Sequence, residues 1–158
     1  MNKAPSKFRK LFGSGPAGVV ISLVLFYIAY RLNSKFNLPP ISDNEFLLNS
    51  IFIVSILLTV SMVVWSFKSL PANDRGNKLC VTGAFKYVRH PLYAAFISIF
   101  SFGLAFHLNS FIFILWAMFL NPLWHFIVSH EEKMMIEIFG DQYIEYQKKT
   151  GQFFPRLL

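Results

Sequence analysis

Four long apolar segments constrain what this chain can fold into. They run over residues 16–32, 46–67, 91–107 and 111–128. A helix needs about 20 residues to cross a hydrocarbon core about 30 Å thick, and spans of about 17–25 residues occur. The sequence therefore predicts an all-α, polytopic membrane helical bundle with about four transmembrane helices. A further helix, cytoplasmic or interfacial, is expected near the C-terminus.

The composition agrees with lipid as the surrounding solvent. Only 15% of the 158 residues are charged, whereas soluble domains average about 25%. Nineteen residues are Phe, a side chain that lipid-facing helix surfaces carry without a cost in solubility. By its length the chain is one domain, so residues 1–158 are interpreted as a single membrane domain.

The net charge of +7 arises between the apolar segments. Thirteen of the fifteen Lys and Arg residues lie in the N-terminal tail, in the loop after the second segment, or after the fourth segment; only Arg31 and Lys35 do not. Because cytoplasmic loops carry the excess of basic residues, both termini and the central loop are predicted to be cytoplasmic. Attraction to anionic lipid explains this charge better than binding of nucleic acid.

Proline and turn residues place the segment boundaries. Pro91 sits where a new helix can begin, since its missing N–H is not needed in a first turn. Only the few residues around 108–110 separate the third and fourth segments, which predicts an antiparallel hairpin. At the end of the first segment, Tyr30-Arg31-Leu32 offers no small-residue cleavage site, so we expect this segment to be retained as a span.

A first polar cluster covers residues 77–93, just before and within the third segment. Arg89 and His90 precede Pro91, which places them at the mouth of the helix, at the boundary of water and lipid. Arg and Tyr are also ordinary interfacial anchors in membrane proteins. The cluster is therefore either a functional site or an anchor for the span.

A second polar cluster covers residues 130–156 and begins with Glu131 and Glu132. Adjacent carboxylates near lipid are costly, and at a helix C-terminus they would also oppose the helix dipole. If the helix continues into the cytoplasm, the dipole penalty disappears, but a cationic partner is still expected. Arg89 and Lys86 are the nearest candidates on the same membrane face, and a purely structural salt bridge is the alternative.

A third polar feature lies inside the fourth segment, where Asn121, Pro122 and His125 occur together. Pro122 is expected to kink the helix. Asn121 and His125 are four residues apart and share a helix face, so both are expected to turn toward the bundle interior or a wet cavity. Hydrogen bonding between helices is the alternative role.

These clusters resemble the isoprenylcysteine carboxyl methyltransferase family and the related phospholipid N-methyltransferases. The similar stretch runs from Thr82-Gly83 through an aromatic residue to Arg89-His90-Pro91-Leu92-Tyr93, and the paired glutamates and the closing Phe154-Pro155-Arg156 also match. The resemblance covers residues 75–158. It implies S-adenosyl-L-methionine as the cofactor, bound between the two clusters, in elements 77–93 and 130–156. Carried over by position, the cofactor-binding residues are Asn77, Lys78, Leu79, Cys80, Phe85, His90, Pro91, Leu92, Tyr93 and Glu131.

The resemblance predicts an integral membrane methyltransferase that acts at the cytoplasmic face on a lipid-like or small apolar acceptor. Arg89, His90 and Glu132 are the predicted catalytic residues. Methyl transfer by in-line displacement needs no base for a carboxylate or thiolate, whereas an amine or thiol needs one, and His90 or His130 is suited to that role.

Two positions depart from the family pattern. Ile127 stands where isoprenylcysteine enzymes carry an arginine on the substrate side, which makes a prenylated-protein carboxylate a doubtful acceptor. Ala95 replaces a residue that is usually glycine, which is a mild change.

Two other functions stay open at this point. One is a non-catalytic membrane scaffold of the same fold, and the other is an NADPH-dependent membrane reductase, because sterol reductases have a similar architecture. A metal site is not expected, since the single cysteine, Cys80, and four scattered histidines lack the spacing of metal ligands.

Overall fold

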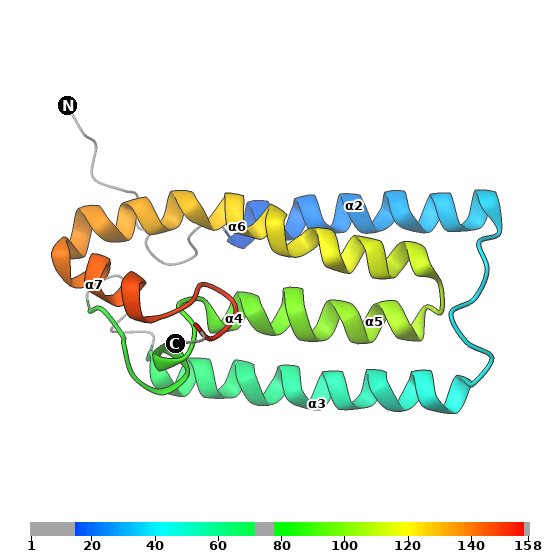
Figure 1. The fold of residues 1–158 in the computed structure, drawn as a ribbon, viewed down its shortest axis with the longest axis horizontal. Helices are drawn as coiled ribbons and strands as arrows, with labels where there is room; N and C mark the ends of the chain where they lie inside the picture. The colour runs from blue at the N-terminus through cyan, green and yellow to red at the C-terminus, as the bar shows by residue number, and fades with distance from the viewer. Residues whose placement is uncertain (1–14, 72–77, 157–158) are drawn as a thin grey trace.

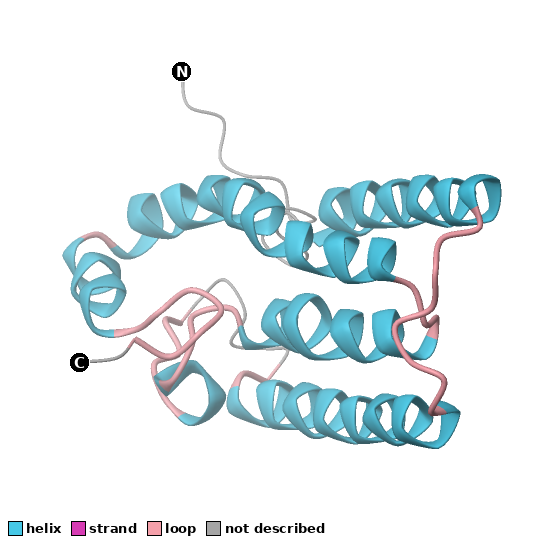
Figure 2. Ribbon diagram, turned by 45° about the vertical axis from the view of Figure 1, so that its right-hand side comes forward, coloured by secondary structure: helices cyan, strands magenta, loops and turns pink. Residues whose placement is uncertain are grey.

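The computed structural model describes residues 15–71 and 78–156, and all regular elements in these ranges are helical (Figure 2). The long helices are α2 (Gly15–Phe36), α3 (Glu45–Ser69) and α6 (Phe111–Phe139). The shorter elements are η2 (Gly83–Lys86), α4 (Pro91–Ala94), the π-helical η3 (Ala95–Phe100), α5 (Ser101–His107) and α7 (Asp141–Lys149).

The long helices lie side by side along one axis (Figure 1). The continuous helix formed by α4, η3 and α5 lies between α6 and α3, while α2 packs on α6. Helix α7 and the C-terminal tail gather at the end of the bundle where α4 begins. This arrangement brings the two polar clusters of the sequence to the same end of the molecule, which we call the site end.

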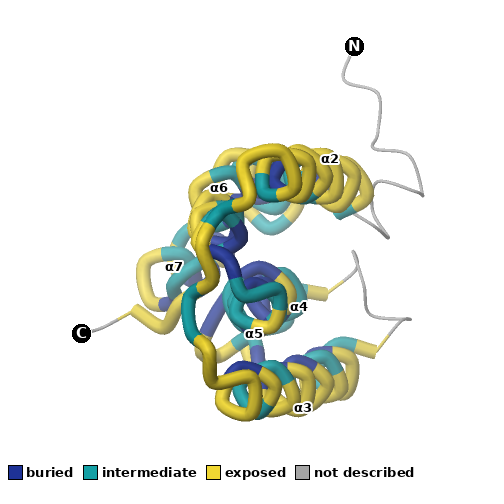
Figure 3. The backbone as a smooth tube through the Cα atoms, turned by 90° about the vertical axis from the view of Figure 1, so that its right-hand side faces the viewer, coloured by how far each residue is buried: buried dark blue, intermediate teal, exposed yellow. Residues whose placement is uncertain are grey.

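Figure 3, which views the bundle end-on, shows buried positions turned toward the bundle interior and exposed positions on its outside. Many of the exposed positions carry large apolar side chains. In α3 the buried positions include Ser55, Thr59 and Ser66, whereas Leu57 and Leu58 are exposed. Each buried hydroxyl donates to a backbone carbonyl of its own helix, so it leaves no unsatisfied polar group in the interface. An apolar exterior of this extent is typical of a protein whose helices face lipid.

Three of the four predicted spans are long apolar helices. Helices α2, α3 and α6 have the length and composition needed to cross a membrane, which agrees with the prediction of an integral membrane protein. The third predicted span, Pro91–His107, has the predicted bounds but is a shorter apolar helix. It begins at Pro91, as the sequence predicts, and the turn before Phe111 forms the predicted hairpin.

The π-helical turn η3 interrupts this shorter helix. A π turn frees backbone groups from the regular helical pattern and often marks a functional region. Here the Thr59 hydroxyl of α3 lies 3.5 Å from the Ala95 carbonyl and donates to it, which ties the irregular turn to the neighbouring helix. Ala95, the position that departs from the family's glycine, is fully buried.

Helix α6 continues well beyond the predicted end of the fourth span, as far as Phe139. Glu131 and Glu132 therefore lie within a helix rather than at its C-terminus, and the dipole penalty does not apply. The helix ends at Gly140, whose φ of 56° and ψ of −134° suit glycine and allow α7 to turn back toward the bundle.

The polar residues inside α6 have separate environments. Asn121 accepts a hydrogen bond from Ser98 Oγ at 3.0 Å, which is the interhelical bond that the sequence allowed. The expectation that His125 turns inward with it is wrong, because His125 is exposed and bonds Gln152 of the C-terminal tail. The hydrogen-bond partner of His125 therefore comes from the C-terminal tail and not from the bundle interior.

Candidate functional site

A buried ion pair joins the start of α4 to α6 at the site end. Arg89 Nε lies 2.7 Å from Glu132 Oε1 and Arg89 Nη2 lies 3.1 Å from Oε2, so the guanidinium donates to both carboxylate oxygens. His90 Nε2 lies 3.1 Å from the same Oε1. The predicted cationic partner of the glutamate pair is therefore Arg89 rather than Lys86, and a fork of two parallel bonds is the strong form of this pairing.

Helix α7 completes the surroundings of this pair. Gln147 Nε2 donates to Glu132 Oε2 at 3.0 Å, and Arg89 Nη1 donates to the carbonyls of Gln147 and Thr150. Every nitrogen of the Arg89 guanidinium thus has an acceptor within the protein. Both charged side chains are about one-tenth exposed, so these bonds offset the cost of burying them.

The C-terminal tail fixes the backbone next to the ion pair. Arg89 N donates to Gly151 O at 2.8 Å and His90 N donates to Gln152 O at 3.1 Å, and Val88 pairs with Gly151 in a short parallel bridge. A Cβ atom at Gly151 would lie 1.9 Å from the Phe154 carbonyl oxygen, so the tail needs glycine there. The closing residues of the chain therefore hold Arg89 and His90 in place.

The loop before α4 is anchored to the end of α3 through Ser69. Ala84 N donates to Ser69 Oγ at 3.1 Å and Cys80 Sγ donates to Ser69 O at 3.2 Å. Gly83 has a φ of 58°, and a Cβ there would lie 2.1 Å from Ser69 Oγ. This turn therefore requires glycine for its backbone conformation and for space.

Tyr146 of α7 holds the other side of this loop by donating its hydroxyl to the Phe85 carbonyl. Burial raises the pKa of Tyr146 well above its usual value. The hydroxyl therefore keeps its proton and remains a donor across the physiological range.

A cavity of about 730 Å³ lies between these elements. It contains every described member of the predicted cofactor set, and Asn77 lies outside the described residues. The predicted residues that line it are Lys78, Leu79, Cys80, Phe85, His90, Pro91, Leu92, Tyr93 and Glu131. The two distant stretches of sequence thus meet at one cavity.

The two adjacent glutamates have different positions at this cavity. Glu131 lines the cavity and accepts a hydrogen bond from Tyr93 Oη at 3.3 Å. Glu132 is buried behind the cavity wall, where it binds Arg89, His90 and Gln147. Of the three predicted catalytic residues, Arg89 and His90 line the cavity and Glu132 does not.

Sequence reasoning missed several parts of the cavity wall. They come from the start of α2, the end of α3 and the helices around the clusters, and most are apolar: Gly15, Pro16, Val19, Ser66, Phe67, Leu70, Phe96, Ile97, Trp124, Met134, Met135 and Ile138. Apolar residues of a span carry no local sign that they face a cavity rather than lipid. Gln147, which binds Glu132, is also an ordinary polar residue of a surface helix by its sequence context.

The sequence of the chain matches a known protein family. The sequence model of the phospholipid methyltransferase family matches residues 44–142, which is more than half of the chain. No curated protein matches the chain closely enough to count as a relative. The chain belongs to the phospholipid methyltransferase family.

Proposed function

We propose that this member of the phospholipid methyltransferase family transfers a methyl group from S-adenosyl-L-methionine to an apolar or lipid-like acceptor at the cytoplasmic face of a bilayer. The observation that carries the proposal is the cavity at the site end. It gathers residues 78–80, Phe85, residues 89–93 and Glu131 around one space, although Glu131 is far from the others in the sequence. The family match favours this activity over the scaffold and the NADPH-dependent reductase.

The residues present fit the cofactor in size and chemistry. A cavity of about 730 Å³ lies within the range of roughly 300–1,000 Å³ that small-molecule sites occupy. The Glu131 carboxylate suits the ammonium group of the amino acid part, and the Phe85 and Tyr93 rings offer faces for adenine and for a sulfonium cation. The cofactor supplies an activated methyl group on a positively charged sulfur.

The orientation proposed from the basic residues places the site end in the cytoplasm. The helix Pro91–His107 lies between α3 and α6, two helices long enough to cross the bilayer, so it is proposed to cross with them as the fourth span. Helix α7 then lies at the cytoplasmic surface, and the cofactor reaches the cavity from water. Residues 1–158 form one membrane domain in this proposal.

His90 is the residue proposed to move a proton. The Glu132 carboxylate accepts from Nε2, which assigns the proton to that nitrogen and leaves the Nδ1 lone pair as a base. His130 is exposed and does not line the cavity, so His90 has the better position of the two candidates. Glu132 and Arg89 then act as positioning residues, because they hold the His90 ring and its backbone.

An acceptor with a removable proton fits this site better than a carboxylate. A carboxylate needs a cation close to it. All the guanidinium nitrogens of Arg89 already bind Glu132 and two carbonyls, and Lys78, which also lines the cavity, belongs to the proposed cofactor-binding set. Ile127, at the position of the family's arginine, is not among the residues that line the cavity. An amine or a thiol with an apolar body is therefore the proposed acceptor class.

The bilayer is the proposed source of this acceptor. Val19 of α2 and Phe96 of η3 both line the cavity, yet they are 50% and 49% exposed on the outer surface of the helices. These two side chains therefore form a wall between the cavity and the apolar exterior. An amphiphile is able to approach there from the lipid while its apolar body stays out of water.

The first test is binding of S-adenosylhomocysteine to the purified protein in detergent, measured by calorimetry. Glu131→Gln is expected to weaken binding at least tenfold, because the ammonium group loses its carboxylate partner. Glu137→Gln is the matched control, since Glu137 lies on the same helix, is exposed and does not line the cavity. Equal affinity of Glu131→Gln and the wild type would exclude the proposed site, and stabilisation by NADPH but not by S-adenosylhomocysteine would favour the reductase.

A further inference from the structure

Trp124 forms the deep end of the cavity. It is 4% exposed and lines the cavity together with Val19, Phe96 and Ile97. On α6, Trp124 lies seven residues before Glu131. Along the helix axis it is therefore about 10 Å farther from the site end than Glu131 is. The polar lining of the cavity lies near Glu131, so the part near Trp124 suits the apolar body of an acceptor.

The indole ring of Trp124 is held from behind by α2. Its Nε1 donates to Ser22 Oγ at 2.9 Å, and that hydroxyl in turn donates to Gly18 O at 2.8 Å. A Cβ atom at Gly18 would lie 2.7 Å from two atoms of the ring. The absence of a side chain at Gly18 therefore lets the ring sit close to α2.

The other face of the ring meets the residues that surround the reacting end of the site. Its centroid lies 4.8 Å from that of Tyr93, and the Tyr93 ring stacks on His90 at 5.7 Å and 7°. Gly18 and Ser22 do not line the cavity. The ring thus forms the wall between the cavity and the α2–α6 interface, and the Tyr93 ring lies between it and the proposed base.

We propose that Trp124 is a specificity-determining residue, which limits the length of apolar chain that the site accepts beyond the reacting atom. This inference rests on the proposed function, because the chain it limits is that of the methyl acceptor. A smaller side chain at 124 opens the cavity toward Gly18 and Ser22. A larger side chain at 18 pushes the ring into the cavity and shortens it.

Trp116 provides a matched control on the same helix. It donates its indole N–H to Ser22 O at 3.2 Å and packs edge-on against Phe26 at 5.1 Å, so it also docks α2 on α6. It does not line the cavity. A variant at 116 therefore loses a comparable contact between the helices without changing the cavity wall.

The experiment uses cofactor analogues, so that it does not depend on knowing the acceptor. In these analogues nitrogen replaces the sulfur and carries an n-alkyl chain, in a series from methyl to dodecyl. The alkyl chain is attached to this nitrogen at the position of the transferred methyl group. It therefore extends into the part of the cavity proposed for the acceptor. Affinities for the full-length protein in detergent are measured by calorimetry, with S-adenosylhomocysteine as the reference ligand in every variant.

In the wild type, affinity is expected to rise with chain length until the chain meets Trp124, and then to fall. Trp124→Leu and the milder Trp124→Phe are expected to move the best-binding analogue to a longer chain, with a gain of about tenfold for two added methylenes. Gly18→Ala is expected to move it to a shorter chain. Trp116→Phe is expected to keep the wild-type preference.

The outcomes separate this inference from the function on which it rests. If the wild type binds neither S-adenosylhomocysteine nor any analogue, the proposed function fails and the inference fails with it. If S-adenosylhomocysteine binds normally but the preferred chain length is the same in the wild type, Trp124→Phe and Gly18→Ala, only the inference is overturned. Gly18→Ala and Trp124→Phe decide the matter even if Trp124→Leu does not fold.

Discussion

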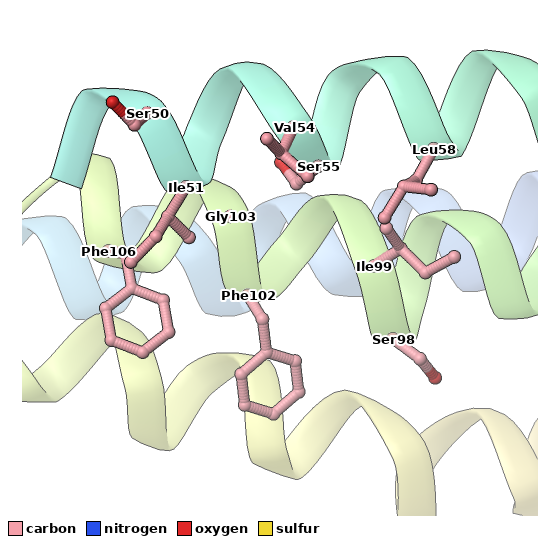
Figure 4. A pocket seen from close by; sticks show the side chains of 10 residues that line it. All are labelled: Ser50, Ile51, Val54, Ser55, Leu58, Ser98, Ile99, Phe102, Gly103 and Phe106. Atoms are coloured by element: carbon pink, nitrogen blue, oxygen red, sulfur yellow. The ribbon is translucent and has the colours of Figure 1, made fainter. Parts of the chain in front are cut away.

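The two ends of the bundle are held together in different ways. At the site end, the ion pair of Arg89 and Glu132 is surrounded by donors and acceptors from α4, α6, α7 and the tail. Toward the other end, α3 meets η3 and α5 along a shallow apolar groove of about 430 Å³ (Figure 4). Its polar lining consists of serine hydroxyls, and a Cβ atom added at Gly103 would overlap the Ser55 side chain.

This difference reflects where each kind of interaction is effective. Helices within lipid gain little from burying apolar surface against one another, so small residues that allow close backbone approach stabilise them. At the site end, α7 and the tail are short segments that need directional bonds to hold a fixed position. Changes at the site end are therefore expected to affect ligand binding and stability together, whereas changes in the groove between α3 and α5 are expected to affect stability alone.

The largest effect is expected from Arg89→Met. The variant leaves the Glu132 carboxylate buried without its main cationic partner, which destabilises a protein by about 3–5 kcal/mol. Binding of S-adenosylhomocysteine is expected to be lost as well, since the guanidinium group that joins the start of α4 to α6 and α7 is removed. Thermal unfolding in detergent and calorimetry measure the two effects.

Arg156→Met is the control for Arg89→Met. Arg156 also donates to backbone carbonyls of α7, but it is exposed. Its replacement is expected to leave the unfolding midpoint close to that of the wild type. A similar, small loss in both variants would show that the buried pair does not hold the site end together.

A smaller effect confined to stability is expected from Gly103→Ala. The added Cβ would lie 1.8 Å from Ser55 Oγ and 2.3 Å from Ser55 Cβ, so α3 and α5 must separate. Overpacking of this kind costs about 1–3 kcal/mol. The affinity for S-adenosylhomocysteine is expected to stay the same, because neither residue lines the site cavity.

The double variant Ser55→Gly with Gly103→Ala tests the cause of that loss. Removing the Ser55 side chain removes the atoms that the new methyl group meets, so most of the stability is expected to return. If the double variant unfolds at the same temperature as Gly103→Ala, close packing at this contact is not what holds α3 and α5 together. A fall in cofactor affinity in Gly103→Ala would show instead that the two ends are coupled.

The smallest effect is expected from Glu145→Gln at the site end itself. Glu145 and Lys148 form an ion pair at 2.7 Å, but their side chains are 57% and 64% exposed. Water and salt screen such pairs, so no measurable change in the unfolding midpoint or in cofactor affinity is expected. A clear loss would mean that charge at the surface of α7, and not only the buried pair, positions this helix.

Much of the architecture could be predicted from the sequence because hydropathy acts locally. A run of apolar residues must find lipid or a core wherever it lies, so the helices appear close to the predicted ranges, and Pro91 begins its helix as predicted. The end of α6 could not be placed this way. Residues 129–139 contain the glutamates that bind Arg89 and Tyr93, and they pack against α7, so partners distant in the sequence support this part of the helix.

The sequence by itself determined that the chain forms long apolar helices suited to a membrane, and its motifs predicted which stretches of the chain line the cavity. Only the tertiary structure decided that Glu131 faces the cavity while Glu132 is buried in an ion pair, and that α2 and Trp124 close the cavity at its deep end. The physical reason is that a side chain's role depends on the atoms packed against it. Those atoms come from segments far away in the chain, so no local pattern of residues specifies them.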